Sequence, residues 1–176
     1  PPSKSLSHRA LICAALSKGT STISNVLLSE DIKTTIEALE HLGAKFKINA
    51  DTITVTGVKK PKYDNEPVFC NESGSTIRFL IPIFSLTNKK IEFTGKESLI
   101  NRPQTIYKKI FDHDQNLFVK EDNKIVVKGS IKAREYFIDG DVSSQFFSGL
   151  MFSLPLLDED SRIYYNGSLE SKSYID

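Results

Sequence analysis

Three clusters of small polar residues, each followed by an apolar stretch, hold the side chains in this sequence that could bind a ligand. They lie at residues 3–9, 71–78 and 141–145, and the first two include an arginine, Arg9 and Arg78. Serine before an apolar run is typical of a helix start, where unpaired N–H groups and the helix dipole attract anions. If the three helices run parallel, their starts form one anion-binding site.

The charges near these helix starts indicate what kind of anion would bind. Lys4, Arg9 and Arg102 are cations, and arginine can hold a phosphate or carboxylate through two hydrogen bonds. Gly74, at the second helix start, would let a ligand approach the backbone closely. The expected ligand is therefore a small polyanion that carries phosphate and carboxylate groups.

Each of these features also has a purely structural interpretation. A serine before an apolar run is usually only a helix cap. Arg78 could pair with an internal carboxylate such as Glu72 instead of a ligand. The three histidines, His8, His41 and His113, lack the spacing of metal ligands, so no metal site is expected.

The elements that must position these residues recur in a fixed order. Residues 5–17, 75–86 and 143–154 are predicted to form helices that are apolar nearly all round and therefore buried. Residues 31–42 and 103–111 are predicted to form amphipathic helices on the outside. Strands are predicted at 20–25, 45–48, 52–56, 67–70, 90–94, 117–120, 124–128, 136–139 and 162–165.

This order predicts an internal repeat of about 70 residues, with Arg9 and Arg78, and likewise Gly57 and Gly129, at matching places. The unit is strand–helix–strand–helix–strand–strand. The first unit lacks its opening strand, the second is whole and the third lacks its second half, so we expect the chain to be a fragment. The three apolar helices should pack together inside the sheets, and Pro82 should kink its helix or move its end.

The composition argues against several other classes of protein. The 176 residues include 23 Lys and Arg against 22 Asp and Glu, a balance that argues against a strongly basic nucleic-acid binder. No apolar run approaches the roughly 18 residues that span a bilayer, and no signal peptide is apparent. Two cysteines, Cys13 and Cys70, are too few for a disulfide framework, and Cys13 is expected in the core. We therefore expect a cytoplasmic protein.

Five segments resemble, in order, motifs of the 5-enolpyruvylshikimate-3-phosphate (EPSP) synthase family. They are Pro2–Leu11, Asn71–Arg78, Asn101–Pro103, Gly140–Phe146 and Ser171–Asp176. The resemblance covers essentially the whole chain. It implies an α/β fold in which repeated βαβαββ units pack as an inside-out α/β barrel, the fold of enolpyruvyl transferases, here incomplete.

The same resemblance implies a domain organisation. Residues 1–176 would be most of the N-terminal domain of a two-domain enzyme, with units at 1–57, 67–129 and 135–176. The C-terminal domain would be absent. Because that domain holds the family's acid–base carboxylates and further basic residues, we expect the chain to be inactive alone.

The resemblance also implies a reaction and a set of site residues. The enolpyruvyl group of phosphoenolpyruvate moves to the 5-hydroxyl of shikimate 3-phosphate, phosphate is released, and no metal or organic cofactor takes part. The positions that match the shikimate 3-phosphate site are Lys4, Ser5, Arg9, Ser143, Ser144, Gln145, Ser171 and Tyr174. Those that match the phosphoenolpyruvate site are Lys4, Gly74, Ser75, Arg102 and Gln145. Lys4 is the expected catalytic residue, stabilising charge on the departing phosphate, and Arg78 is expected just behind the site.

Two alternatives stay open. One is the sister UDP-N-acetylglucosamine enolpyruvyl transferase, which shares the fold but typically has Lys-Asn where this chain has Lys4-Ser5. The other is a non-catalytic module of the same architecture that binds an anion or an RNA end. We expect a monomer that binds the two substrates and the missing C-terminal domain, with no nucleic acid and no membrane as partner.

Overall fold

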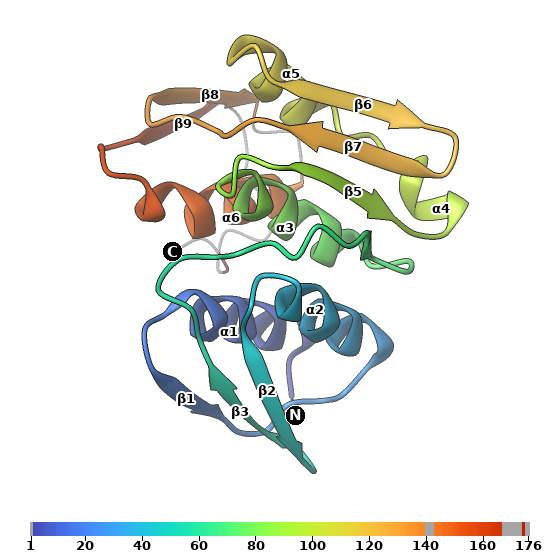
Figure 1. Cartoon of the computed structure of the whole chain (residues 1–176), viewed down its shortest axis with the longest axis vertical. Helices are drawn as coiled ribbons and strands as arrows, with labels where there is room; N and C mark the ends of the chain where they lie inside the picture. Colours follow the sequence, from blue (N-terminus) through green and yellow to red (C-terminus); the bar gives the residue numbers. More distant parts are fainter. Residues whose placement is uncertain (1, 140–142, 167–173, 175–176) are drawn as a thin grey trace.

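The structure, a computed structural model, describes residues 2–139, 143–166 and 174 (Figure 1). Its inner helices are α1 (Lys4–Leu16), α3 (Gly74–Ser85) and α6 (Ser144–Ser153). The other helices are α2 (Glu30–Glu40), α4 (Glu97–Ile100), α5 (Thr105–His113) and the 3₁₀ turn η1 (Leu154–Leu156). The strands are β1 (Thr20–Ile23), β2 (Lys45–Asn49), β3 (Thr52–Thr56), β4 (Val68–Phe69), β5 (Lys90–Thr94), β6 (Leu117–Glu121), β7 (Lys124–Lys128), β8 (Glu135–Asp139) and β9 (Arg162–Asn166).

Three sheets repeat one pattern of strand pairing. In the sheet of order β4-β5-β7-β6, β4 and β5 are parallel, and β7 is antiparallel to both of its neighbours. The sheet β1-β3-β2 repeats the antiparallel part, with β1 in the place of β5. The pair β8-β9 is parallel, as β4 and β5 are. The repeated α/β fold that the sequence predicts is confirmed.

The inner helices lie between the sheets, with the strands on the outside of the molecule (Figure 1). α1 and α2 cover one face of the sheet β1-β3-β2, and α3 and α6 lie beneath the strands of the other two sheets. Ile12, Leu80 and Leu150, one from each inner helix, are fully buried. Helices that are apolar nearly all round require burial of this kind, because each side of them must leave water.

The sequence predicts that Pro82 kinks its helix or moves the helix end. Pro82 lies inside α3, which continues to Ser85, so the second of these alternatives is wrong. Proline has no N–H to donate to the carbonyl four residues earlier, which belongs to Arg78. The hydroxyl of Tyr107, on α5, donates to that carbonyl instead. α6 presents Gly149 here, and a Cβ on it would collide with both the Tyr107 hydroxyl and the Arg78 carbonyl. A glycine is needed for α3 and α6 to pack this closely.

Other expectations need smaller corrections. α1 begins at Lys4 and not at residue 5, because the Ser3 hydroxyl accepts the backbone N–H of Leu6 and caps the helix. The single turn α4 has no counterpart in the prediction. Cys13 is exposed and not in the core, whereas Cys70 is buried, and both are free thiols. In the described part of the chain, no helix is both long enough and apolar enough to span a bilayer.

Candidate functional site

The starts of the three inner helices lie at one end of the helix layer. The Gln145 side-chain amide, on α6, donates to the Ser75 hydroxyl on α3 at 2.9 Å, and both are the second residue of their helix. The Arg9 guanidinium donates to Ser148 Oγ at 2.8 Å, which joins α1 to α6 one turn further on. The helices therefore run parallel and nearly in register, the arrangement required for a single anion site.

Arg9 is held at this end with hydrogen-bonding capacity to spare. Its guanidinium lies 4.9 Å from the ring centre of Phe79 and 5.1 Å from that of Tyr174. Its Nε and Nη1 are buried and have no partner among the described residues. Burial lowers the pKa of this guanidinium, and the Tyr174 hydroxyl opposes that shift. Unpaired buried donors are costly, so these two N–H groups favour an anionic ligand.

Lys4 is engaged in an ion pair. Its ammonium lies 2.7 Å from the Asp31 carboxylate in the first turn of α2. Lys4 is the first residue of α1, where the helix dipole disfavours a cation, and Asp31 offsets that cost. The Lys4 side chain is 53% exposed, so the pair contributes little to stability. Ser5, the next residue, is half-buried.

Gly74 and Arg102 lie against each other at the start of α3. A Cβ on Gly74 would be 2.7 Å from Arg102 Nη1, so a larger residue here would displace the Arg102 guanidinium from its place beside α3. The Gln145 amide oxygen lies 3.8 Å from the same point. The structure thus brings together four positions that, by the resemblance, match the phosphoenolpyruvate site: Gly74, Ser75, Arg102 and Gln145.

Arg78 makes its contacts within the protein. Its Nη1 donates to Gln145 Oε1 at 3.0 Å, and its guanidinium lies 4.7 Å above the Phe146 ring. Burial, and after it the charge of Arg102, lower its pKa. The suggested partner Glu72 instead pairs with Lys96 at 3.3 Å. The alternative of an Arg78–Glu72 pair is therefore wrong, and Arg78 orients the Gln145 amide.

The serines of α6 differ in role. Ser143 is the helix cap, its hydroxyl accepting the Gln145 backbone N–H at 3.4 Å, while Ser144 is buried. Tyr174 packs on Arg9, and Ser171 lies outside the described residues. In the described residues, no cluster of three His, Cys, Asp or Glu could hold a metal ion.

Two residues that bind the cations of this site were not predicted from the sequence. Ser148, which binds Arg9, follows Ser144 by one helical turn, and that spacing was the available signal. Asp31, which binds Lys4, lies in the first turn of α2. Acidic residues are common in that turn, so nothing in the sequence indicated that Asp31 would pair with Lys4. Both pairs join helices distant in the sequence.

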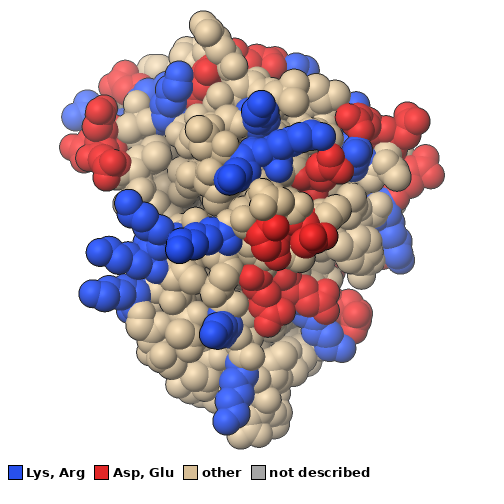
Figure 2. All heavy atoms as spheres, in the orientation of Figure 1, with Lys and Arg blue, Asp and Glu red and all other residues tan. Residues whose placement is uncertain are grey.

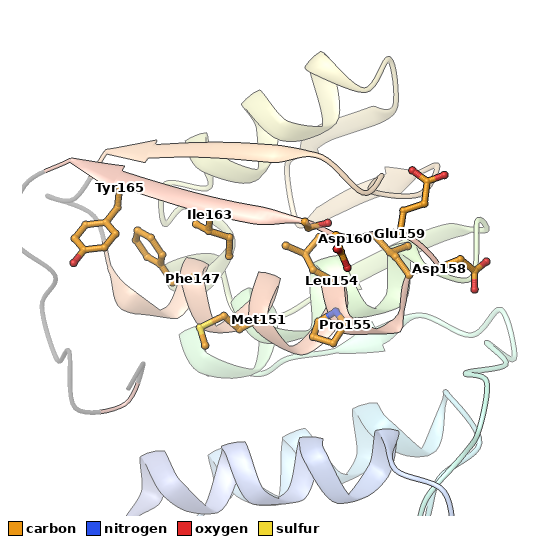
Figure 3. Close-up of a pocket in the computed structure, with 11 residues that line it drawn as sticks. Phe147, Met151, Leu154, Pro155, Asp158, Glu159, Asp160, Ile163 and Tyr165 are labelled. Atoms are coloured by element: carbon orange, nitrogen blue, oxygen red, sulfur yellow. The ribbon is translucent and has the colours of Figure 1, made fainter.

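A cavity of about 550 Å³ lies elsewhere, between α6, η1 and β9 (Figure 3). Phe147, Met151, Leu154 and Ile163 line it, together with the carboxylates of Asp158 and Asp160. None of the predicted site residues lines it, and an apolar wall with carboxylates does not suit an anion. The candidate site is therefore the cluster at the helix starts.

The face in Figure 2 carries charges of both signs. Basic side chains gather at its left edge and in its upper centre, and acidic side chains gather at its centre, right edge and upper left. This mixture agrees with the net charge of +1. The cations of the candidate site act through their position at the helix starts and not through the overall charge.

Solved structures define the class of this fold. EPSP synthase from Acinetobacter baumannii matches with a TM-score of 0.83 at 21% identity, over 97% of this chain and 40% of that chain. The enolpyruvyl transferase NikO from Streptomyces tendae matches with a TM-score of 0.62 at 12% identity, over 93% of this chain and 38% of that chain. The chain thus has the enolpyruvyl transferase fold.

The particular family follows from the sequence comparisons. The family model of EPSP synthase (3-phosphoshikimate 1-carboxyvinyltransferase) matches residues 1–176, and the chain belongs to this family. A 3-phosphoshikimate 1-carboxyvinyltransferase of Clostridium perfringens (strain SM101) is 46% identical over 179 residues. That match covers 100% of this chain and 42% of the relative. The chain thus spans well under half the length of the curated relatives it matches.

Proposed function

We propose that this chain forms the N-terminal, shikimate 3-phosphate-binding part of an enolpyruvyl transferase. The whole enzyme moves the enolpyruvyl group of phosphoenolpyruvate to the 5-hydroxyl of shikimate 3-phosphate and releases phosphate. Membership of the EPSP synthase family supports the proposal, as do relatives named 3-phosphoshikimate 1-carboxyvinyltransferase. The observation that carries it is Arg9, whose two buried, unpaired N–H groups lie where the starts of α1 and α6 meet.

In this proposal the phosphate ester is held by charge-assisted hydrogen bonds. Arg9 grips the phosphate, and the hydroxyls of Ser5, Ser144 and Ser171 bind the phosphate and the ring hydroxyls. Ser143 shares its hydroxyl between the α6 cap and the ligand. Tyr174, already packed on the Arg9 guanidinium, lies against the ring of the bound substrate.

Phosphoenolpyruvate occupies the neighbouring cluster. Arg102 and the start of α3 at Gly74 and Ser75 take its carboxylate and phosphate, and Gln145 touches both substrates. Lys4 leaves Asp31 and stabilises the negative charge of the departing phosphate, which makes it the catalytic residue of this part. Bond rearrangement needs acid–base groups that we assign to the C-terminal part of the enzyme.

The domain organisation is likewise a prediction that rests on membership of the family. We propose that residues 1–176 are most of one domain, with units at 1–57, 67–129 and 135–176, and that a C-terminal domain closes over the helix starts. The chain spans 42% of the relatives, which is consistent with this division. A cytoplasmic, monomeric state without nucleic acid as partner likewise remains a prediction.

A titration followed by NMR identifies the ligand. Shikimate 3-phosphate, added to ¹⁵N-labelled chain, should shift the backbone amides of Ser5 and Gln145 and leave distant amides such as that of Arg162 in place. UDP-N-acetylglucosamine should leave all three amides unchanged. Shifts with the nucleotide sugar alone would contradict the proposal and favour the sister enzyme. Shifts with an RNA end alone would favour the non-catalytic module.

A further inference from the structure

A buried chain of hydrogen bonds joins α1 to the cap of α3 through α2, and the proposed mechanism does not use it. His8 Nδ1 lies 2.8 Å from Thr35 Oγ1, and Thr35 Oγ1 lies 2.7 Å from Thr76 Oγ1. Thr76 Oγ1 donates to Ser73 Oγ at 2.7 Å. His8, Thr35 and Thr76 are fully buried and Ser73 is 2% exposed, so water does not compete for these bonds.

The direction of the chain follows from counting protons. A hydroxyl has one proton to donate. Since Thr76 donates its proton to the Ser73 oxygen, the Thr76 oxygen must accept from Thr35. Thr35 has then used its own proton, and it must accept from His8. The proton of the neutral imidazole therefore lies on Nδ1, which leaves Nε2 as a bare acceptor.

The surroundings of the imidazole agree with this state. Nε2 is buried and has no partner among the described residues. Burial lowers the pKa of His8 to about 4, with the Asp31 carboxylate opposing the shift and the charges of Lys4 and Arg9 adding to it. The ring therefore stays neutral near pH 7. A neutral imidazole carries a single proton, and the hydrogen bonds to Thr35, Thr76 and Ser73 determine which ring nitrogen holds it.

This series of hydrogen bonds connects the two groups of proposed substrate ligands. α1 carries Lys4, Ser5 and Arg9, and α3 begins with Gly74 and Ser75 directly after the Ser73 cap. α2 packs against both of these helices and supplies Thr35 between them (Figure 1). A shift of α1 relative to α3 would have to break a fully buried hydrogen bond.

We propose that His8 is a positioning residue that, protonated on Nδ1, fixes the start of α3 relative to α1 through Thr35, Thr76 and Ser73. It touches no reacting atom. Its effect on the substrates rests on the proposed function, whereas the hydrogen-bond chain itself does not.

The first test reads the tautomer directly. NMR of the chain with ¹⁵N-labelled histidine, at pH 7 and without ligand, should show a protonated Nδ1 and an unprotonated Nε2 for His8. A proton on Nε2 would overturn the proposal, because the chain of donors would then have no start. The measurement requires no variant and no substrate, so it stands apart from any failure of the proposed function.

The second test removes the Thr35 hydroxyl, which lies in the middle of the hydrogen-bond series. T35V should move the Gly74 and Ser75 amide resonances at least three-fold more than T34V does. Thr34 is the matched control, since it is a buried threonine on the same helix, one residue earlier, and is not a member of this series of hydrogen bonds. T35S, which keeps the hydroxyl, should restore the wild-type positions of both resonances. Equal shifts in T35V and T34V, or no rescue by T35S, would contradict the role of His8.

Discussion

Arg9 and Arg78 occupy matching places in the repeats, yet their surroundings differ. Both guanidiniums lie on aromatic rings, but among the described residues Arg78 donates to Gln145 and Pro103 and leaves its Nε unpaired, whereas Arg9 donates to Ser148 alone and leaves both Nε and Nη1 unpaired. The unpaired donors of Arg9 make it the stronger ligand candidate, because a buried donor without an acceptor is costly. Sequence spacing alone could not distinguish the two, since their partners come from α6.

The buried imidazole of His8 makes stability depend on pH. Its pKa is about 4 in the fold against 6.5 in a model peptide. Between these values the unfolded chain binds a proton that the folded chain does not, so stability falls as pH falls from about 6.5 to 4. We expect a loss on the order of 3 kcal/mol across this window, measured by urea unfolding. His8→Leu should remove this part of the slope, and an unchanged slope in the variant would contradict the assignment.

At the scale of elements, the contact of α3, α5 and α6 around Pro82 replaces a missing backbone hydrogen bond. Sequence reasoning foresaw a disturbed helix and could not foresee that Tyr107 would supply the donor. The positions of the inner helices were predictable because their apolar character extends nearly all round. Their mutual contacts were not, because they depend on Gly149 and on side chains from three helices.

Tyr107→Phe tests this replacement. Loss of the hydroxyl leaves the Arg78 carbonyl without a donor in a buried place, which should cost about 1–3 kcal/mol of unfolding free energy. In Pro82→Ala, residue 82 regains an N–H that can donate to the same carbonyl. The double variant should therefore lose less than Tyr107→Phe alone, as a double-mutant cycle in urea would show. Additive effects would mean that the hydroxyl does not replace the proline's missing bond.

At the scale of the whole molecule, the repeat was visible in the sequence. The order of elements predicted three related units. In the structure, the sheet β1-β3-β2 repeats the antiparallel pairings of the sheet β4-β5-β7-β6, and the pair β8-β9 repeats its parallel pairing. The cavity beside β9 was not foreseen, because apolar residues of α6 and η1 and the acidic residues of the following segment line it together, and no sequence pattern links them. The resemblance to the family suggested residue roles, which remain proposals, that periodicity could not provide.

The division of the enzyme predicts that this chain has no turnover of its own. The proposed site holds cations and hydroxyls, and we assign the acid–base groups of the reaction to a second, C-terminal domain. Purified chain, incubated with shikimate 3-phosphate and phosphoenolpyruvate, should release no phosphate above a protein-free control. Phosphate release that co-purifies with the chain and disappears in Lys4→Ala would contradict the division.

We propose that the starts of α1, α3 and α6 form one phosphate site with Arg9 at its centre. Calorimetric titration of shikimate 3-phosphate into the wild-type chain and into Arg9→Ala tests this proposal. A charged hydrogen bond contributes about 1.5–3 kcal/mol, so Kd should rise by roughly 10- to 150-fold in the variant. Arg162→Ala, at an exposed arginine paired with Glu135, should leave Kd unchanged. An Arg9→Ala variant that binds shikimate 3-phosphate as tightly as the wild type would show that Arg9 is not a phosphate ligand.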